Sequence, residues 1–191
     1  MEAFLVSTGI VALAEIGDKT QLLALVLAAR FRRPWPILAG ILLATLANHA
    51  LAGGVGAWVT RVVDPEVLRW AVGLSFIAMA LWTLVPDRLD ESEAGRPQRF
   101  GVFGTTLVAF FLVEMGDKTQ VATIALAAQY ASFVAVVAGT TLGMLSANAP
   151  VVLLGERIAR RMPVRLVHAI AALVFLALGV LVLFGTGRSI G

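Results

Sequence analysis

The chain has 191 residues, of which 59% are hydrophobic and only 14% are charged, and its formal net charge is +3. This balance excludes a soluble globular fold, which would need far more polar surface, and is typical of a polytopic membrane protein. The basic excess does not indicate nucleic-acid binding, because the arginines lie in short segments between apolar stretches, and the absence of cysteine excludes a disulfide framework or a thiolate metal site.

Six apolar stretches follow one another along the chain, and each can cross a hydrocarbon core of about 30 Å as a helix. In chain order they cover residues 4–29, 35–59, 68–85, 101–128, 131–154 and 164–186. Residues 86–100, between the third and the fourth, are rich in acids and arginines and contain two prolines, so they predict a loop. The fold class predicted is all-α: a three-helix repeat over 1–85, a linker loop over 86–100 and a second three-helix repeat over 101–191.

Three spans in each half predict that the second half enters the membrane from the opposite side, as an inverted repeat. The arginines then set the orientation, since cytoplasmic loops carry an excess of positive residues. Most arginines fall on one predicted side, namely Arg30, Arg32, Arg33, Arg88, Arg96, Arg99, Arg157, Arg160, Arg161 and Arg165, whereas the other side has Arg61, Arg69 and Arg188. We therefore expect the 86–100 loop in the cytoplasm and both termini outside.

One charged heptapeptide occurs twice, inside the first span of each half. The copies begin at Glu15 and Glu114, 99 positions apart, and read EIGDKTQ and EMGDKTQ. The same offset relates further pairs, which extends the repeat over the whole three-helix unit: Ser7 and Thr106, Gly40 and Gly139, His49 and Asn148, Arg61 and Arg160, Phe76 and Phe175.

The charges of this motif predict a function in the membrane. An ionised side chain at mid-bilayer costs about 2.5–3.5 kcal/mol on insertion scales, so six of them are not explained by packing. In a continuous helix, Glu15, Asp18 and Lys19 would share one face, because positions i, i+3 and i+4 are neighbours. Both copies start near the middle of their spans, so the four carboxylates of the two motifs are expected to converge near the midplane.

The charge count suggests a ligand. Four carboxylates and two lysine ammoniums sum to −2, which one divalent cation or two protons would neutralise. Oxygen ligands suit hard cations such as Ca²⁺, Mg²⁺ and Mn²⁺. The expected metal ligands are Glu15, Asp18, Glu114, Asp117, Gln21, Gln120 and Asn148, and the expected gating or charge partners are Lys19, Lys118, Thr20 and Thr119.

Simpler interpretations exist for several of these residues. Glu15–Lys19 and Glu114–Lys118 could be local ion pairs that only hold the bundle together. A lone histidine such as His49 is more often a helix-contact residue than a ligand. The small-residue pairs Gly40/Ala44 and Gly139/Gly143 favour helix packing inside the fold over dimerisation.

The two motifs resemble the E-x-G-D-[KR]-[ST] signatures of a cation transporter family found in bacteria, chloroplasts and the Golgi. The resemblance covers nearly the whole chain, and both motifs match in full. It implies a Mn²⁺ or Ca²⁺ transporter, in many members a cation–proton exchanger, in which Glu15, Asp18, Glu114 and Asp117 bind the cation. The short N-terminus resembles the bacterial members and so implies a multi-pass exporter of Mn²⁺ in the cell membrane.

The leading expectation is therefore a secondary transporter that exports Mn²⁺ in exchange for protons by alternating access. A Ca²⁺/H⁺ antiporter on the same scaffold is the nearest alternative. An exporter of small organic cations or amino acids is a further alternative, although the four tryptophans lie mostly towards span ends and not around a pocket. A membrane scaffold protein that transports nothing is the last alternative. No enzyme motif or cofactor site is expected, the partners are the divalent ion and the bilayer, and the oligomeric state is left open.

Overall fold

The computed structural model describes residues 1–85, 101–130, 132–155 and 163–185, and all regular secondary structure in these ranges is helical. The first half contains α1 (Glu2–Glu15), α2 (Lys19–Phe31), α3 (Pro34–Val62) and α4 (Pro65–Thr83). The second half contains α6 (Gly101–Glu114), α7 (Lys118–Tyr130), α8 (Phe133–Leu154) and α10 (Val164–Leu183). The all-α prediction is confirmed, while the predicted 86–100 loop lies outside the described residues.

Within the part of the chain that the structure describes, four helices are long and apolar enough to cross a membrane: α3, α4, α8 and α10. Their bounds agree with the predicted spans 35–59, 68–85, 131–154 and 164–186 to within a few residues. Proline at the first helical turn begins both α3 and α4, where its missing N–H group costs nothing. The apolar stretches of these four elements were thus sufficient to predict them.

The prediction of one continuous helix over 4–29, and another over 101–128, is wrong. Each of these stretches is two helices, interrupted within the charged motif. Gly17 has φ +85° and Gly116 has φ +79°, a conformation that glycine adopts without the steric cost a β-carbon would bring. Glu15, Asp18 and Lys19 therefore do not lie on one helical face, and neither do their counterparts in the second motif.

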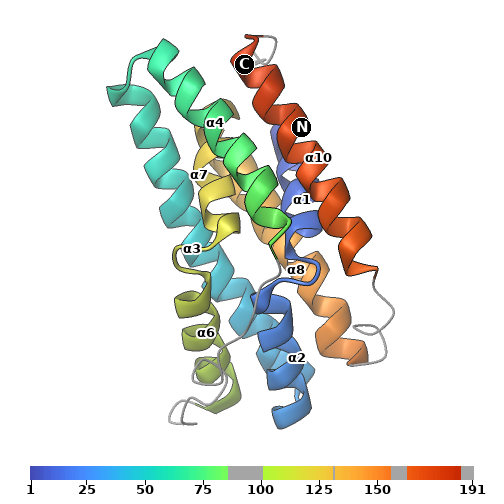
Figure 1. Ribbon diagram of the computed structural model, residues 1–191. Coiled ribbons are helices and arrows are strands. Elements are labelled where there is room, and N and C mark those ends of the chain that lie inside the picture. The colour runs from blue at the N-terminus through green and yellow to red at the C-terminus, as the bar shows by residue number, and fades with distance from the viewer. Residues whose placement is uncertain (86–100, 131, 156–162, 186–191) are drawn as a thin grey trace.

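The two broken helices run in opposite directions through the bundle (Figure 1). The chain descends through α1 and α2 in the view shown, and ascends through α6 and α7. Each broken helix packs on the long helix of the other half: α1 and α2 on α8, and α6 and α7 on α3. The two motifs are thereby brought together at the centre of the bundle from opposite ends.

Glycines allow these helices to approach closely. A β-carbon on Gly139 of α8 would lie 2.5 Å from the carbonyl oxygen of Phe4, and one on Gly143 would lie 2.6 Å from that of Thr8. On the equivalent helix α3, a β-carbon on Gly40 would lie 2.8 Å from Cβ of Thr106. These small residues serve packing within the fold, as predicted.

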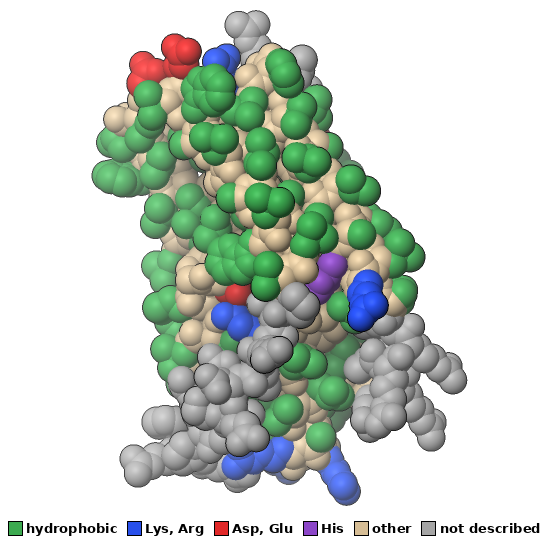
Figure 2. Space-filling view, in the orientation of Figure 1, with side chains coloured by type: hydrophobic (Ala, Val, Ile, Leu, Met, Phe, Trp, Pro, Cys, Tyr) green, Lys and Arg blue, Asp and Glu red, His purple; other side chains and the backbone are tan. Residues whose placement is uncertain are grey.

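Two groups of buried apolar side chains lie on either side of the motifs. The first combines side chains from α1, α4, α7 and α10, together with Val136 of α8, and in it the rings of Phe76 and Phe175 stack with centroids 6.3 Å apart. The second combines side chains from α2, α3, α6 and α8, together with Val11 of α1. Figure 2 shows hydrophobic side chains over most of one face, with basic side chains at both ends of the bundle and also part-way along it. An apolar exterior of this kind suits contact with lipid.

Candidate cation site

The residue types of the motif explain why each helix breaks where it does. Glu15 ends α1, Ile16 is extended, and Gly17 has the positive φ that turns the chain. Asp18 then caps α2, its side chain accepting a hydrogen bond from the backbone N–H of Thr20 at 3.4 Å. The motif therefore contains the end of one helix followed directly by the start of another.

Both motif glutamines stabilise the break. The Oε1 atom of Gln21 accepts a hydrogen bond from the N–H of Gly17 at 2.9 Å, and that of Gln120 accepts one from Gly116 at 2.7 Å. Their amide nitrogens donate to the opposite half, that of Gln21 to the carbonyl of Ala147. Each glutamine is therefore engaged at both ends of its amide group and braces the broken helix against the long helix beside it.

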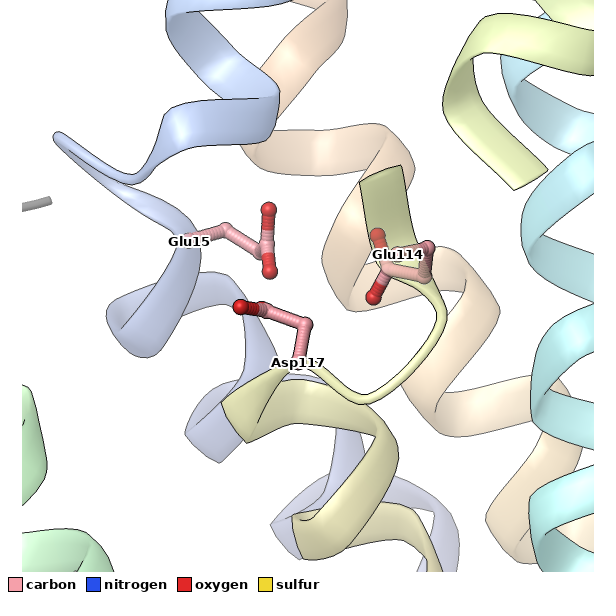
Figure 3. Close-up of side chains that lie close together, drawn as sticks. All are labelled: Glu15, Glu114 and Asp117. Carbon is pink, nitrogen blue, oxygen red and sulfur yellow. The ribbon is translucent and has the colours of Figure 1, made fainter. Parts of the chain in front are cut away.

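Three carboxylates meet where the broken helices face each other. Glu15, Glu114 and Asp117 each offer an oxygen within 4.8 Å of the other two (Figure 3). All three side chains are almost completely buried. Six-coordinate oxygen sites have ligand distances of about 2.0–2.6 Å, so carboxylates this close can hold one cation between them.

Each lysine pairs with the aspartate of the other motif. Nζ of Lys19 lies 3.2 Å from Oδ1 of Asp117, and Lys118 forms an ion pair with Asp18. The structure thus pairs the lysines across the two motifs, whereas the simpler interpretation had Glu15–Lys19 and Glu114–Lys118 as local pairs. The crossed pairs tie the two halves together at the motif itself.

The two glutamates carry the remaining negative charge of the motifs. One oxygen of Glu15 accepts a hydrogen bond from the hydroxyl of Thr20, and one oxygen of Glu114 accepts a hydrogen bond from Thr119. The other oxygen of each, Oε1 of Glu15 and Oε2 of Glu114, is buried and has no hydrogen-bond partner among the described residues. Since buried polar atoms are rarely left unpaired, these oxygens point to an occupant that the protein does not itself supply.

The seven predicted ligands thus fall into different environments. Glu15, Glu114 and Asp117 lie together, whereas Asp18 caps α2 and pairs with Lys118. Asn148 on α8 is buried, and its amide nitrogen donates to the carbonyl of Met144 at 3.0 Å while its Oδ1 has no partner in the described structure. The glutamines are occupied with the backbone and with α3 or α8, as described above.

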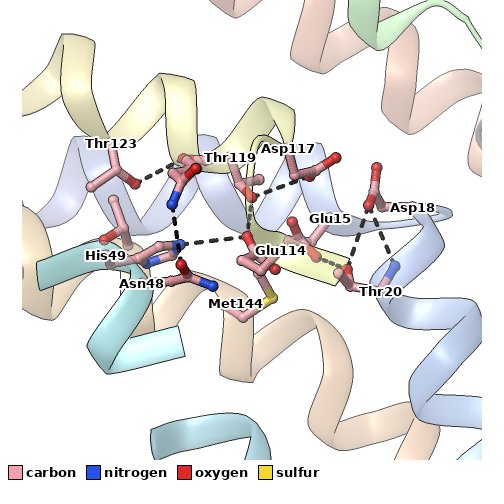
Figure 4. A network of polar contacts seen from close by, with 12 residues as sticks. Glu15, Asp18, Thr20, Asn48, His49, Glu114, Asp117, Thr119, Thr123 and Met144 are labelled. Carbon is pink, nitrogen blue, oxygen red and sulfur yellow. Dashed lines mark hydrogen bonds and ion pairs between the residues drawn. The ribbon is translucent and has the colours of Figure 1, made fainter. Parts of the chain in front are cut away.

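Two residues of α3 lie beside the motif (Figure 4): Asn48, which sequence reasoning missed, and His49, which it interpreted as a helix-contact residue. Asn48 accepts a hydrogen bond from Gln120 at 3.1 Å and donates one to the carbonyl of Phe111 at 2.9 Å. His49 lies with its Nε2 atom 3.7 Å from Oε1 of Glu114 and is fully buried. The signal in the sequence was the pair of polar residues in an otherwise apolar span.

The two sides of the site differ in exposure. The Lys19 side chain is 22% exposed, whereas that of Lys118 is completely buried. The turn at Gly17 packs against Val164 of α10, and His168 of the same helix lies 2.7 Å from the carbonyl oxygen of Ile16. By contrast, a β-carbon on Gly116 would meet no atom of the described residues within 4 Å. The structure is therefore asymmetric although the motifs are repeated.

Comparison with known proteins agrees with this organisation. The model of the family described as "Divalent cation/proton antiporter GDT1" matches residues 3–91 and 102–189, one segment in each half. No solved structure matches the chain.

Curated relatives extend over nearly all of the chain. A Vibrio cholerae protein named "Putative manganese exporter" is 50% identical over 185 residues, covering 96% of this chain and 92% of its own. A GDT1-like protein of Synechocystis is 29% identical over 92% of this chain and 93% of its own. GDT1-like protein 3 of Arabidopsis thaliana is 27% identical over 94% of this chain and 69% of its own.

Proposed function

Because this chain belongs to the GDT1 family of divalent cation/proton antiporters, we propose that it exports Mn²⁺ from the cell in exchange for protons. It is a multi-pass membrane protein, and the proposed location is the cell membrane. The observation that carries the proposal is the buried group of Glu15, Glu114 and Asp117, in which both glutamates have an oxygen without a partner among the described residues. A relative named for manganese export supports the choice of ion.

Electroneutrality favours exchange over one-way transport. If each lysine neutralises its aspartate, the site retains the two charges of Glu15 and Glu114. One divalent cation or two protons cancels this charge equally well. A neutral site is less costly to close off in a low-dielectric interior than a charged one. The proposed cycle therefore alternates between a metal-bound and a doubly protonated form.

The proposed architecture is six membrane crossings in two inverted three-helix repeats, with the first crossing of each repeat made of two half-helices. The opposite directions of α1–α2 and α6–α7, and the matching contacts with α8 and α3, support it. Broken helices near the midplane at a repeat interface are a recurrent form of substrate site in transporters. The 1–85 and 101–191 repeats, the cytoplasmic 86–100 loop and external termini remain part of this proposal.

The lysines are proposed as gate elements. Lys118, fully buried against Asp18, belongs to the closed side, and the partly exposed Lys19 belongs to the accessible side. The turn of each motif would be covered by the last helix of a repeat in alternation, as α10 covers the turn at Gly17 here. Thr20 and Thr119 orient the glutamates, Gln21 and Gln120 brace the broken helices, and Asn148, whose Oδ1 atom is buried without a partner in the described structure, remains a proposed ligand.

Ion uptake into proteoliposomes tests this function. With an acidic interior, the purified protein should accumulate Mn²⁺ as protons leave, and uptake should collapse when the pH gradient is dissipated. Ca²⁺ and Mg²⁺ are measured in parallel, because an all-oxygen carboxylate group also suits a Ca²⁺/H⁺ antiporter. No pH-dependent uptake of any of the three ions would refute the proposal.

A further inference from the structure

His49 is a polar residue whose position is not explained by the cluster of three carboxylates. It lies on α3, is 0% exposed, and neither ring nitrogen has a hydrogen-bond partner in the described parts of the chain. A buried polar group left unpaired costs about 1–3 kcal/mol, so such groups usually have a partner. The ring needs a ligand that the described residues do not provide.

The ring faces the cation site. Its Nε2 atom is 3.7 Å from Oε1 of Glu114, and Figure 4 shows the imidazole directed at that carboxylate. This separation is too long for a hydrogen bond. It fits two ligands of one ion, which lie about 3–4.5 Å apart when each bond is about 2.0–2.3 Å.

Glu114 connects the ring with the other carboxylates. Its oxygen is one of the three ligand atoms that lie within 4.8 Å of one another, a group that does not include His49. The Oε2 atom of Glu114 has no hydrogen-bond partner among the described residues. A cation held by Glu114 can therefore be reached by carboxylates on one side and by the imidazole on the other.

We infer that His49 is a nitrogen ligand of the transported cation and the residue that favours Mn²⁺ over Ca²⁺ and Mg²⁺. This inference rests on the proposed function. Ca²⁺ and Mg²⁺ take oxygen ligands, whereas imidazole suits first-row transition metals, so one nitrogen donor in a carboxylate site shifts the preference towards Mn²⁺.

The equivalent position in the second half offers no such donor. Asn148 stands 99 positions after His49 and carries an amide. Its Oδ1 atom is buried without a partner in the described structure, while its nitrogen is engaged with Met144. Of these two equivalent positions, His49 alone carries an imidazole nitrogen, so its effect is separable by mutation.

The experiment combines spectroscopy with competition. Mn²⁺ bound to the purified wild type should show an electron spin echo modulation from a directly coordinated ¹⁴N, changed in the expected way when histidine is labelled with ¹⁵N. The coupling should vanish in His49→Asn and in His49→Gln. The ratio of Ca²⁺ to Mn²⁺ dissociation constants should fall by about tenfold or more in both variants, a factor that corresponds to about 1.4 kcal/mol.

The other histidine provides a matched control. His168 on α10 is buried, and its ring contacts the carbonyl oxygen of Ile16 rather than a carboxylate. His168→Asn should keep the nitrogen coupling and the ion preference, whatever it does to stability. Bound Mn²⁺ without nitrogen coupling in the wild type, or an unchanged ion ratio in both His49 variants, overturns the inference.

The same samples separate this inference from the proposed function. If the wild type binds and exchanges Mn²⁺ but lacks the nitrogen coupling, only the role of His49 fails. If Glu15→Gln and Glu114→Gln retain full Mn²⁺ binding, the proposed site itself fails, and with it the ligand role of His49. Should either His49 variant not fold, the wild-type spectrum alone decides whether a histidine nitrogen is bound.

Discussion

The crossed lysine–aspartate pairs give each motif a contact with the other that neither could make alone. Lys118 is fully buried with Asp18, whereas Lys19 is partly exposed beside Asp117. A buried ion pair is costly to break from one side, because the remaining charge stays in a poorly solvated place. The two lysines therefore differ in how much they stabilise this conformation, despite their equivalent positions in the sequence.

Neutralising the lysines should slow transport more than it weakens binding. Lys118→Gln removes the ammonium from a fully buried aspartate and should destabilise the protein by about 3–5 kcal/mol, while Lys19→Gln should cost less because its site is partly solvated. Thermal unfolding, Mn²⁺ affinity and Mn²⁺ flux are measured on both. Flux at the wild-type rate in both variants would show that the lysines are counter-charges and not gates.

Residue-level reasoning from the sequence identified the ionisable groups but not their partners. The two copies of the motif and their central depth were visible in the order of residues. The pairing of Lys19 with Asp117 was not, because it depends on how the halves pack together. His49 was interpreted as a helix-contact residue, because its closeness to Glu114 arises only from tertiary packing and cannot be read from the sequence.

At the scale of elements, the decisive feature is the break inside each first span. Half-helix termini place backbone dipoles and a capping aspartate at the centre of the bundle, where a continuous helix would present only side chains. The break was readable in the sequence, since Gly17 and Asp18 are typical of a helix end followed by a helix start. The apolar residues on both sides favoured one uninterrupted span and outweighed that signal.

Alanine at the two motif glycines tests the break. Gly17→Ala and Gly116→Ala each force a β-carbon into positive φ, at a cost of about 1–2 kcal/mol. Gly17→Ala should be the more destabilising, because its β-carbon would also lie 2.3 Å from Cγ1 of Val164. Thermal unfolding in detergent measures the difference.

A glycine inside a regular helix is the matched control. Gly54 lies within α3, and a β-carbon there would contact none of the residues that the structure describes within 4 Å. Gly54→Ala should be neutral or stabilising by about 0.5–1 kcal/mol. Equal effects of Gly17→Ala, Gly116→Ala and Gly54→Ala would contradict the proposed cause of the breaks.

At the scale of the whole molecule, the structure is one asymmetric arrangement of two similar halves. α10 packs on α1 and covers the turn at Gly17, whereas α4 packs on α7, and no described residue lies within 4 Å of a β-carbon built on Gly116. If the halves exchange these arrangements, the site opens to one side and then to the other. The 99-residue repeat predicted the similarity of the halves. The asymmetry between them depends on tertiary packing, which local sequence patterns do not reveal.

Cysteine labelling tests the proposed orientation in the membrane. The chain has no cysteine, so single substitutions report cleanly. In intact cells, Glu2→Cys and Glu66→Cys should react with an impermeant thiol reagent, while Arg33→Cys, at the exposed α2–α3 connection, should react only after permeabilisation. The reverse pattern would invert the proposed topology without affecting the repeat.

The central claim is that Glu15 and Glu114 carry either one divalent cation or protons across the membrane. The most direct measurement follows internal pH in proteoliposomes when Mn²⁺ is added outside, with Glu66→Gln, a change at an exposed carboxylate, as the control. We expect Mn²⁺ entry coupled to proton exit in the wild type and in Glu66→Gln, and neither in Glu15→Gln or Glu114→Gln. Mn²⁺ entry without proton movement, or undiminished exchange in the two motif variants, would contradict the claim.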